Sequence, residues 1–345
     1  MSVPRAEILD AFGPYEGGWS DGEYHNPEGL ASDSQGNIYV ADGTNHRIQK
    51  VDPDGNFLWK VGAVDAGGRP RPGTAPGQFN LLRGVAIDHE DNLYVGDSTN
   101  HRVQKFDSTG RFQFMFGSFG TGPGQMVSPY GVAVAKDGYI YVTDTHTMFG
   151  GNNRVLKFDQ RGHFISTFGE YGARPGQFAG IFPIEGGTEG PYGIDVGRGT
   201  GHLYVADTAN SRIQIFEGNG NFIRSLGEGT IFQPRQLCLD SEERVYVVGF
   251  HMPPVMRGVD ETVDPIATWG ATPANRFLWV LHREGELLLR IDGAEANRLA
   301  REKDKPEGLF DHPGGRHHAV TVNRADESLV YIQSGHHIVK YRIHW

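Results

Sequence analysis

A unit of roughly forty residues recurs along the chain, and this repeat constrains the fold more than any other feature of the sequence. Each unit contains four short, alternating apolar and polar segments, which in the first unit read GLASD, NIYVAD, HRIQKVD and NFLWKVG. Turn residues such as Asn, Asp and Gly separate the segments, and four strands joined in this way form one blade of a β-propeller. The sequence therefore predicts an all-β, six-bladed propeller that occupies residues 1–345 as a single domain. The predicted blades cover residues 26–62, 82–117, 129–169, 191–227, 234–293 and 317–345.

The sixth unit is one strand short, because the chain ends at Trp345 after its third strand. The missing strand is predicted at the other end of the chain, where residues 6–13 match the pattern of the fourth strand of the first unit. We expect this N-terminal strand to complete the last blade. Closing the ring in this way removes the exposed sheet edge that an open array would carry.

Units one to four share a longer pattern of P-x-G-hydrophobic, Gly-Asn-hydrophobic-Tyr-Val-Ala-Asp, Asn-x-Arg-hydrophobic and Asp-x-x-Gly. This pattern resembles the NHL-repeat family, and the resemblance extends over nearly the whole chain. It implies a propeller fold. It does not by itself imply one function, because the same fold carries enzymes, sensors and adaptors.

Charge and composition exclude several classes of partner. The formal net charge is −10, whereas binding to nucleic acid needs a basic face. The one cysteine, Cys238, cannot form an internal disulfide, and its place in the segment LCLD predicts a buried and inert thiol. Residues 1–14 contain no apolar run long enough for a signal peptide or a membrane helix. We therefore expect a cytoplasmic protein whose partner is neither nucleic acid nor a membrane.

The long insertions in the repeat all fall on one face of the predicted propeller, and the turns on the other face are short. The insertions are residues 63–79, 118–128, 146–152, 170–190, 249–273 and 294–316, the last with a short helix over AEANRLAREKD. Long irregular loops in a compact fold are usually functional. They predict a walled pocket over the channel mouth on that face, and the alternative is neutral drift on a tolerant face.

The residue before the glycine of each P-x-G motif is predicted to face the channel at that mouth. These ring residues are Glu28, Arg83, Tyr130, Tyr192, Arg235 and His318. Two arginines can clamp a carboxylate, so Arg83 and Arg235 are predicted to bind the substrate. A tyrosine beside an arginine can have a lowered pKa and act as a base, and Glu and His add proton-transfer capacity. Tyr130, Tyr192, His318 and Glu28 are therefore predicted to be catalytic. The alternative is a ring that merely plugs the channel.

An Asp and an Arg recur together at the second and third strands of the regular units, as Asp42 with Arg47, Asp97 with Arg102, Asp144 with Arg154 and Asp207 with Arg212. We interpret these pairs as salt bridges that brace the loops. Units five and six lack the pair and carry histidine instead, in VGFHM and SGHH. The replacement of an Asp–Arg salt bridge by histidine on the loop-bearing face indicates a substrate-binding site. His251, the nearby Arg257, and His336 are therefore predicted to contact the substrate.

Among NHL propellers with long loops at the mouth, the chain is most similar to the peptidyl-α-hydroxyglycine α-amidating lyase family. The resemblance implies tyrosine and arginine for proton abstraction and carboxylate binding, three zinc-binding histidines at P-H-G positions, and calcium in many members. Only His318 is a histidine at the matching positions of this chain. A zinc ion would need loop histidines such as His251 or His336.

The sequence thus predicts an enzyme that binds a small, anionic or oxygen-rich molecule at the channel mouth and acts by acid–base chemistry of the lyase, hydratase, isomerase or cyclase kind. No metal ligand is assigned. One alternative is a non-catalytic propeller that binds a ligand or a protein. The other is a metal-dependent relative of the amidating lyases that holds zinc or calcium.

Overall fold

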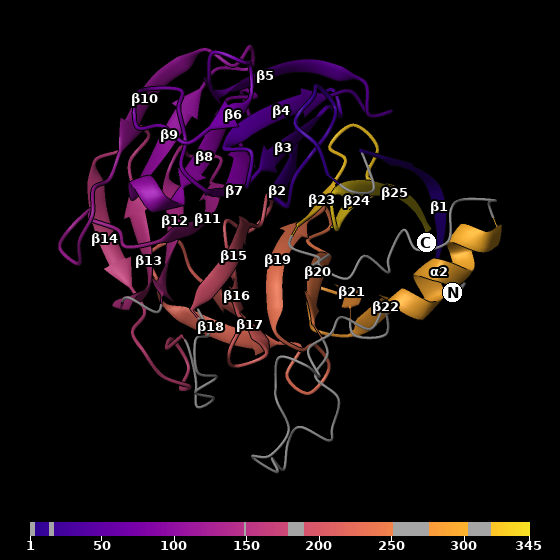
Figure 1. Ribbon diagram of the computed structural model, residues 1–345. Coiled ribbons are helices and arrows are strands. Elements are labelled where there is room, and N and C mark those ends of the chain that lie inside the picture. The colour runs from indigo at the N-terminus through magenta and orange to yellow at the C-terminus, as the bar shows by residue number, and fades with distance from the viewer. Residues whose placement is uncertain (1–3, 14–16, 148–149, 179–189, 251–275, 303–318) are drawn as a thin grey trace, which may run out of the picture.

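The repeats fold into six antiparallel sheets arranged around a common axis (Figure 1). The computed structural model describes residues 4–13, 17–147, 150–178, 190–250, 276–302 and 319–345. Five sheets have four strands, and the sheet of blade one has a short fifth strand at its outer edge. The predicted all-β, six-bladed propeller is confirmed.

The blades follow one another in chain order, and their elements have the following bounds. Blade one comprises β2 (Pro27–Ser32), β3 (Ile38–Asp42), β4 (Arg47–Val51), β5 (Phe57–Val64) and β6 (Pro70–Arg71), and blade two comprises β7 (Leu82–Ile87), β8 (Leu93–Asp97), the 3₁₀ helix η1 (Ser98–Asn100), β9 (Arg102–Phe106) and β10 (Phe112–Phe116). Blade three comprises β11 (Pro129–Val134), β12 (Ile140–Thr147), β13 (Gly150–Phe158) and β14 (Phe164–Phe168), and blade four comprises β15 (Pro191–Val196), β16 (Leu203–Asp207), β17 (Arg212–Phe216) and β18 (Phe222–Leu226). Blade five comprises β19 (Pro234–Leu239), β20 (Val245–Phe250), β21 (Arg276–Leu281) and β22 (Leu287–Asp292), followed by α2 (Gly293–Glu302), and blade six comprises β23 (Val320–Val322), β24 (Leu329–Ser334), β25 (His337–His344) and β1 (Arg5–Phe12).

The first strand of each blade lies innermost, so β2, β7, β11, β15, β19 and β23 surround the axis (Figure 1). Each of these strands contacts the next, and β23 contacts β2. Residues at one repeat position therefore meet at one depth in the channel. We call the end where the inner strands begin the ring end. We call the other end, where tight turns lead from each inner strand to the second strand, the turn end.

The N-terminal strand closes the ring as predicted. β1 pairs antiparallel with β25, from Arg5 opposite His344 to Phe12 opposite Ile338. Ile8 is 1% exposed and packs in the apolar cluster that also contains residues of blades five and six. The outermost strand of blade six is thus supplied by the opposite end of the described chain.

Apolar side chains fill the space between neighbouring blades. Between blades one and two, Tyr39 and Ile48 pack with Val95 and Phe106, and all four are fully buried. Alternation along each strand sends successive side chains to opposite faces of the sheet. Each blade therefore contributes to two such clusters, one on each side.

The repeated Asp–Arg pairs are salt bridges inside the loops, which confirms their predicted bracing role. The distances from Arg Nε to Asp Oδ2 are 2.9 Å for Arg47–Asp42, 2.8 Å for Arg102–Asp97, 3.5 Å for Arg154–Asp144 and 2.8 Å for Arg212–Asp207. Arg47 also donates to the carbonyl oxygens of Trp19, Ser20 and Glu23. Each arginine thus ties the segment that leads into a blade to the second and third strands of that blade.

Several of the predicted insertions contain regular structure, and in 146–152 the ends of β12 and β13 pair with each other. Residues 63–79 include β6, which pairs with the end of β5. The predicted helix after blade five is confirmed as α2, which packs beside β22 and β1 at the periphery (Figure 1). Within the described residues, no helix has the length and apolar character needed to cross a membrane.

Candidate functional site at the ring end

The predicted ring residues lie at β-bulges where the inner strands begin. In β11, Pro129 pairs with Asp144 and Val132 pairs with Val142, so one extra residue is inserted in the inner strand. The strands β2, β7, β15 and β19 have the same irregularity at the same place. A bulge bends its strand and re-aims the side chains that it carries. The ring residues carried by these bulges are Glu28, Arg83, Tyr130, Tyr192 and Arg235.

The glycine of each P-x-G motif allows neighbouring inner strands to approach closely. A Cβ atom at Gly29 would lie 2.4 Å from the carbonyl oxygen of Arg83, and one at Gly84 would lie 2.2 Å from that of Tyr130. No side-chain carbon tolerates such a distance to backbone oxygen, so these positions need glycine. The motif therefore brings the ring residues of adjacent blades into contact.

The carboxylate of Glu28 accepts hydrogen bonds from two other ring residues. Arg83 Nη1 lies 2.8 Å from Glu28 Oε2, and the side chains are 25% and 10% exposed. Tyr130 Oη donates to the same carboxylate oxygen at 3.5 Å. The Glu28–Arg83 ion pair is thus largely shielded from solvent.

The two tyrosines form a stack that is flanked by the two arginines. The rings of Tyr130 and Tyr192 are 4.2 Å apart between centroids, at an interplanar angle of 32°. The guanidinium of Arg83 lies 5.2 Å from the Tyr130 ring, and that of Arg235 lies 4.8 Å from the Tyr192 ring. Both contacts are within the range of a cation–π interaction. The order Arg–Tyr–Tyr–Arg follows blades two to five around the axis.

The electrostatics of the ring favour a protonated Tyr130. Burial and the Glu28 carboxylate raise the pKa of Tyr130 to about 12, although Arg83 and Arg235 act to lower it. The prediction of a lowered pKa beside arginine is therefore wrong for Tyr130, because loss of hydration of the phenolate outweighs the attraction of the guanidinium groups. Burial acts to lower the pKa of Arg83, but Glu28 and the two tyrosines outweigh it and raise that pKa. At neutral pH, Tyr130 is a proton donor.

The structure also places His336, which was predicted to contact the substrate. The backbone N–H of Asn26 donates to His336 Nδ1 at 3.1 Å, and the ring of His336 packs against that of His25. His46 accepts in the same way from the N–H of Leu81 at 2.9 Å, one blade along. His336 therefore holds the segment leading into blade one, as His46 holds the segment leading into blade two. Its role in substrate binding stays a prediction.

Three other predicted site residues, His318, His251 and Arg257, lie outside the described residues. Large parts of three of the insertions that were predicted to wall the ring end also fall there, namely residues 179–189, 251–273 and 303–316. The predicted pocket beneath those loops therefore stays a prediction.

Beyond the ring, the inner strands carry an apolar girdle that lines the inner end of a cavity. The girdle residues follow each ring position by two and are Leu30, Val85, Val132, Ile194, Leu237 and Val320. The cavity has a volume of about 450 Å³ and extends from the girdle to exposed residues of the turn end, such as Lys136 and Arg198. It thus lies at the end opposite to the one where the sequence predicts a pocket.

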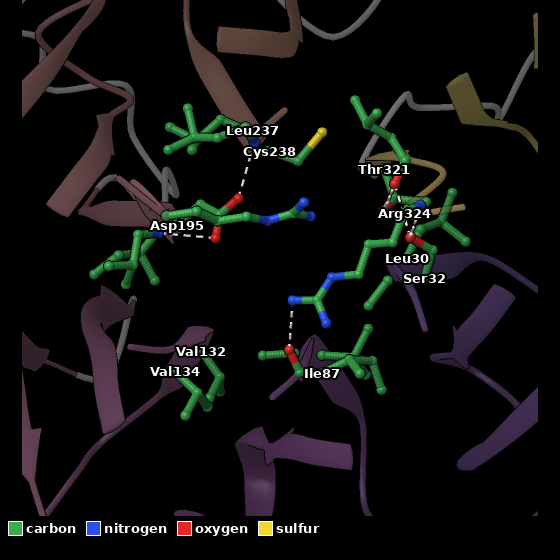
Figure 2. A pocket seen from close by; sticks show the side chains of 18 of the residues that line it. Leu30, Ser32, Ile87, Val132, Val134, Asp195, Leu237, Cys238, Thr321 and Arg324 are labelled. Atoms are coloured by element: carbon green, nitrogen blue, oxygen red, sulfur yellow. Dashed lines mark hydrogen bonds between the residues drawn. The ribbon is translucent and has the colours of Figure 1, made fainter. Parts of the chain in front are cut away.

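Sequence reasoning missed two charged residues of this cavity, Asp195 and Arg324 (Figure 2). A signal for Asp195 was present, because the same position of blades one to three is Ala31, Ala86 or Ala133. Cys238 lines the cavity and is partly exposed, so its thiol is not fully buried as predicted. Burial and the nearby Asp195 raise its pKa well above the usual value, which lowers its reactivity.

The described ring residues do not fit a zinc or calcium ion. Arg83 and Arg235 place two positive charges beside the one carboxylate of Glu28, and Arg83 occupies that carboxylate. Zinc prefers histidine, cysteine or carboxylate ligands, and calcium prefers several oxygen ligands. Among the residues that the structure describes, no group of three or more His, Cys, Asp or Glu side chains converges on one point.

Comparison with known families identifies the repeat. The family model described as NHL repeat matches residues 24–57, 79–106 and 188–216, which lie in blades one, two and four. The chain carries NHL repeats. As an NHL propeller it is 32% identical over 156 residues to protein brain tumor of Drosophila melanogaster, a match that covers 45% of this chain and 13% of that protein.

A second relative agrees with the resemblance noted in the sequence. The NHL propeller is 28% identical over 146 residues to the probable peptidyl-α-hydroxyglycine α-amidating lyase pgal-1 of Caenorhabditis elegans, covering 41% of this chain and 38% of that one. The chain therefore spans much less than the full length of either relative. Its fold is also similar to that of a gluconolactonase from Xanthomonas campestris, with a TM-score of 0.58, 16% identity and coverage of 100% of this chain and 96% of that one.

Proposed function

We propose that this NHL propeller is an enzyme that binds a small, anionic or oxygen-rich molecule at the ring end and acts on it by acid–base chemistry. The observation that carries the proposal is the stack of Tyr130 and Tyr192 between Arg83 and Arg235. Blades two and five lie opposite one another in a ring of six, so the two guanidinium groups approach the axis from opposite sides. Guanidinium groups in this arrangement suit a substrate carboxylate or a developing oxyanion.

The proton-transfer roles follow from the contacts of Tyr130. Its raised pKa keeps the phenol protonated, so it donates a proton or a hydrogen bond to an oxygen that gains negative charge. Glu28, 3.5 Å from Tyr130 Oη, is the group through which this proton can be exchanged. Arg83 holds the Glu28 carboxylate in place. Tyr192 supports the ring of Tyr130 from its other side.

The relatives indicate which reactions to test first. One is named for cleavage of peptidyl-α-hydroxyglycine and another for action on gluconolactone, and both names imply an oxygen-rich substrate. A first assay would follow the release of glyoxylate from α-hydroxyhippurate, a small carboxylate of the same type. A second would follow acid release from δ-gluconolactone in a pH-stat. We expect turnover in one of these assays, of the lyase or hydrolytic kind.

Arg235→Met is the variant that separates binding from chemistry, because Arg235 touches Tyr192 and leaves the Glu28–Arg83 pair intact. Loss of a hydrogen bond to a charged group raises KM by roughly 10- to 100-fold. Arg111→Met, at an exposed turn of blade two, is the control and keeps the wild-type KM. Equal KM values for the two variants on an accepted substrate would contradict the proposed role of Arg235.

The competing function is a non-catalytic NHL propeller that binds a ligand or a protein. The Glu28–Arg83 ion pair favours it, because these groups already satisfy one another as in a plug. This alternative predicts no turnover and tolerance of Tyr→Phe changes in the ring. A metal-dependent relative of the amidating lyases would instead lose turnover after treatment with EDTA and regain it with zinc or calcium.

A further inference from the structure

The inner end of the cavity at the turn end is lined by apolar side chains. The six girdle residues line its inner end, and all six are 8% exposed or less. Val134, Leu239 and Val322 continue the apolar wall towards the turns. A cavity of about 450 Å³ is within the size range of small-molecule sites. Its apolar inner end is suited to an aliphatic group.

Cations dominate the rim of the cavity. Its lining contains Lys136, Arg198 and Arg324, against the single carboxylate of Asp195. The chain as a whole is acidic, with a net charge of −10, so this local excess of positive charge departs from the average surface. A positive rim over an apolar inner end is complementary to an amphipathic anion.

Arg324 is held across the opening by backbone oxygens. It lies in the turn between β23 and β24 of blade six, and its guanidinium reaches past blade one to the end of the inner strand of blade two (Figure 2). Nη1 donates to the carbonyl of Asp88 at 3.0 Å, and Nη2 donates to that of Ile87 at 2.8 Å. Burial and the nearby Arg198 lower the pKa of Arg324, although the carboxylates of Asp195, Asp91 and Asp88 act to raise it. Within the described residues, no carboxylate lies within ion-pair distance of this guanidinium.

Asp195 is directed into the wall. Its Oδ1 accepts the backbone N–H of Val196 at 2.8 Å, and its Oδ2 accepts that of Leu239 in the next blade at 2.9 Å (Figure 2). Burial raises its pKa, which disfavours the negative charge. Asp195 therefore joins blades four and five and offsets little of the positive charge at the rim.

We propose that this cavity binds a small amphipathic anion, a medium-chain carboxylate, with its aliphatic chain on the girdle and its carboxylate at Arg324 and Arg198. Arg198 is 41% exposed and is held by Glu327 at 3.0 Å, so it can also contact an anion at the opening. None of the described ring residues lines this cavity. The proposal is therefore independent of the proposed enzyme activity.

Isothermal titration of the full chain with octanoate, 1-octanol and octylammonium tests the charge preference. Octanoate binds most tightly, 1-octanol more weakly and octylammonium most weakly. Hexanoate binds roughly 15-fold more weakly than octanoate, since each buried CH₂ group contributes about a factor of four. Equal affinity for octanoate and 1-octanol, or no binding of octanoate, would overturn the proposal.

Two variants test the arginines, and a third serves as the control. Arg324→Met and Arg198→Met each weaken octanoate binding by roughly 10- to 100-fold, as expected for the loss of a charged hydrogen bond. The affinity for 1-octanol changes by less than about twofold. Arg161→Met, at an exposed turn of blade three, makes the same change in net charge outside the cavity. Unchanged octanoate affinity in Arg198→Met would contradict the site even if Arg324→Met fails to fold.

The one cysteine of the chain shows where the ligand binds. Cys238 lines the cavity, so slow alkylation by N-ethylmaleimide, followed by intact mass, reports on access to it. Octanoate slows this alkylation in the wild-type protein at least fivefold, in the concentration range found by titration. Octanoate that binds without protecting Cys238 must occupy another place, and this result rejects the proposal.

Discussion

The rings of Tyr130 and Tyr192 pack against each other, 4.2 Å apart between centroids and tilted by 32°, although they begin different blades of the propeller. Both follow a proline and precede a glycine at the start of an inner strand. Their contact arises because the glycine of one blade lets the backbone of the next approach. The same motif that forms the propeller thus also builds the candidate site.

Tyr130→Phe keeps this stack and removes only the hydroxyl group. On an accepted substrate, we expect kcat to fall roughly 100- to 10,000-fold with little change in KM, because a positioned general acid contributes about that factor. With a pKa of about 12, the phenol stays protonated up to high pH, so the wild-type activity shows no alkaline loss due to Tyr130 below about pH 11. If Tyr130→Phe, Tyr192→Phe and His318→Ala all retain full kcat, the catalytic assignment is wrong.

Alkaline pH should destabilise the fold through its buried tyrosines. Burial is the first cause that raises the pKa of Tyr130, Tyr204 and Tyr331, in each case to about 12, against about 10 in an unfolded chain. The stability that they contribute is therefore complete below pH 10 and is lost as the pH rises through 12, at about 1.4 kcal/mol per pKa unit for each group. Urea unfolding at pH 9, 10.5 and 11.5 measures this loss. A free energy of unfolding that is constant over this range would contradict it.

Gly84→Ala should separate blades two and three. The new Cβ atom would meet the carbonyl oxygen of Tyr130 at 2.2 Å, so the two inner strands must move apart and the midpoint of thermal unfolding falls. Gly199→Ala is the matched control, because the nearest atom to its Cβ would be Glu243 Oε1 at 3.4 Å, an ordinary contact. Equal melting temperatures for the two variants would show that the close approach is not required.

The buried salt bridge between Arg47 and Asp42 should contribute far more to the free energy of unfolding than a surface ion pair does. Arg47→Met leaves the fully buried Asp42 without its charged partner, and breaking a buried pair costs about 3–5 kcal/mol. Lys60→Met removes the partner of Asp21 at an exposed site of the same blade and costs less than about 1 kcal/mol. Denaturant unfolding of both variants gives the difference, which we expect to exceed about 2 kcal/mol.

Closure by the N-terminal strand can be tested at one buried side chain. Ile8→Ala removes apolar packing from the seam between β1 and its neighbours, at a cost of about 2–5 kcal/mol. Leu58→Ala is made on β5, the corresponding strand of blade one, where the side chain is 46% exposed, and should be nearly neutral. Similar losses for the two variants would mean that β1 adds little to the ring.

The repeat made most of the fold predictable from the sequence. Strand order, blade number and the closing role of residues 6–13 follow from a pattern that is local and recurs. The positions of Glu28, Arg83 and Tyr130 at the channel also follow, because each occupies the same place in its unit. The role of His336 in holding the segment that leads into blade one could also have been predicted from the repeat. His336 directly precedes the third strand of its blade, as His46 does.

Other features depend on several blades at once and have no local signal. The pKa of Tyr130 is decided by burial and by Glu28 from another blade, so a rule based on the nearest arginine gave the wrong direction. Arg324 donates to carbonyls of blade two, far away in the sequence. The cavity at the turn end is lined by residues from several blades, so no single unit specifies it.

The pairing of β1 with β25 has a consequence for the way in which the protein is made. A ribosome adds roughly 5–20 residues per second, so β1 leaves it on the order of tens of seconds before its partner strand exists. Throughout that interval, the apolar face around Ile8 has no native neighbour in blade six. Until β25 has formed, the nascent chain therefore has an unpaired strand β1. We expect chaperones to bind the chain most readily at that stage.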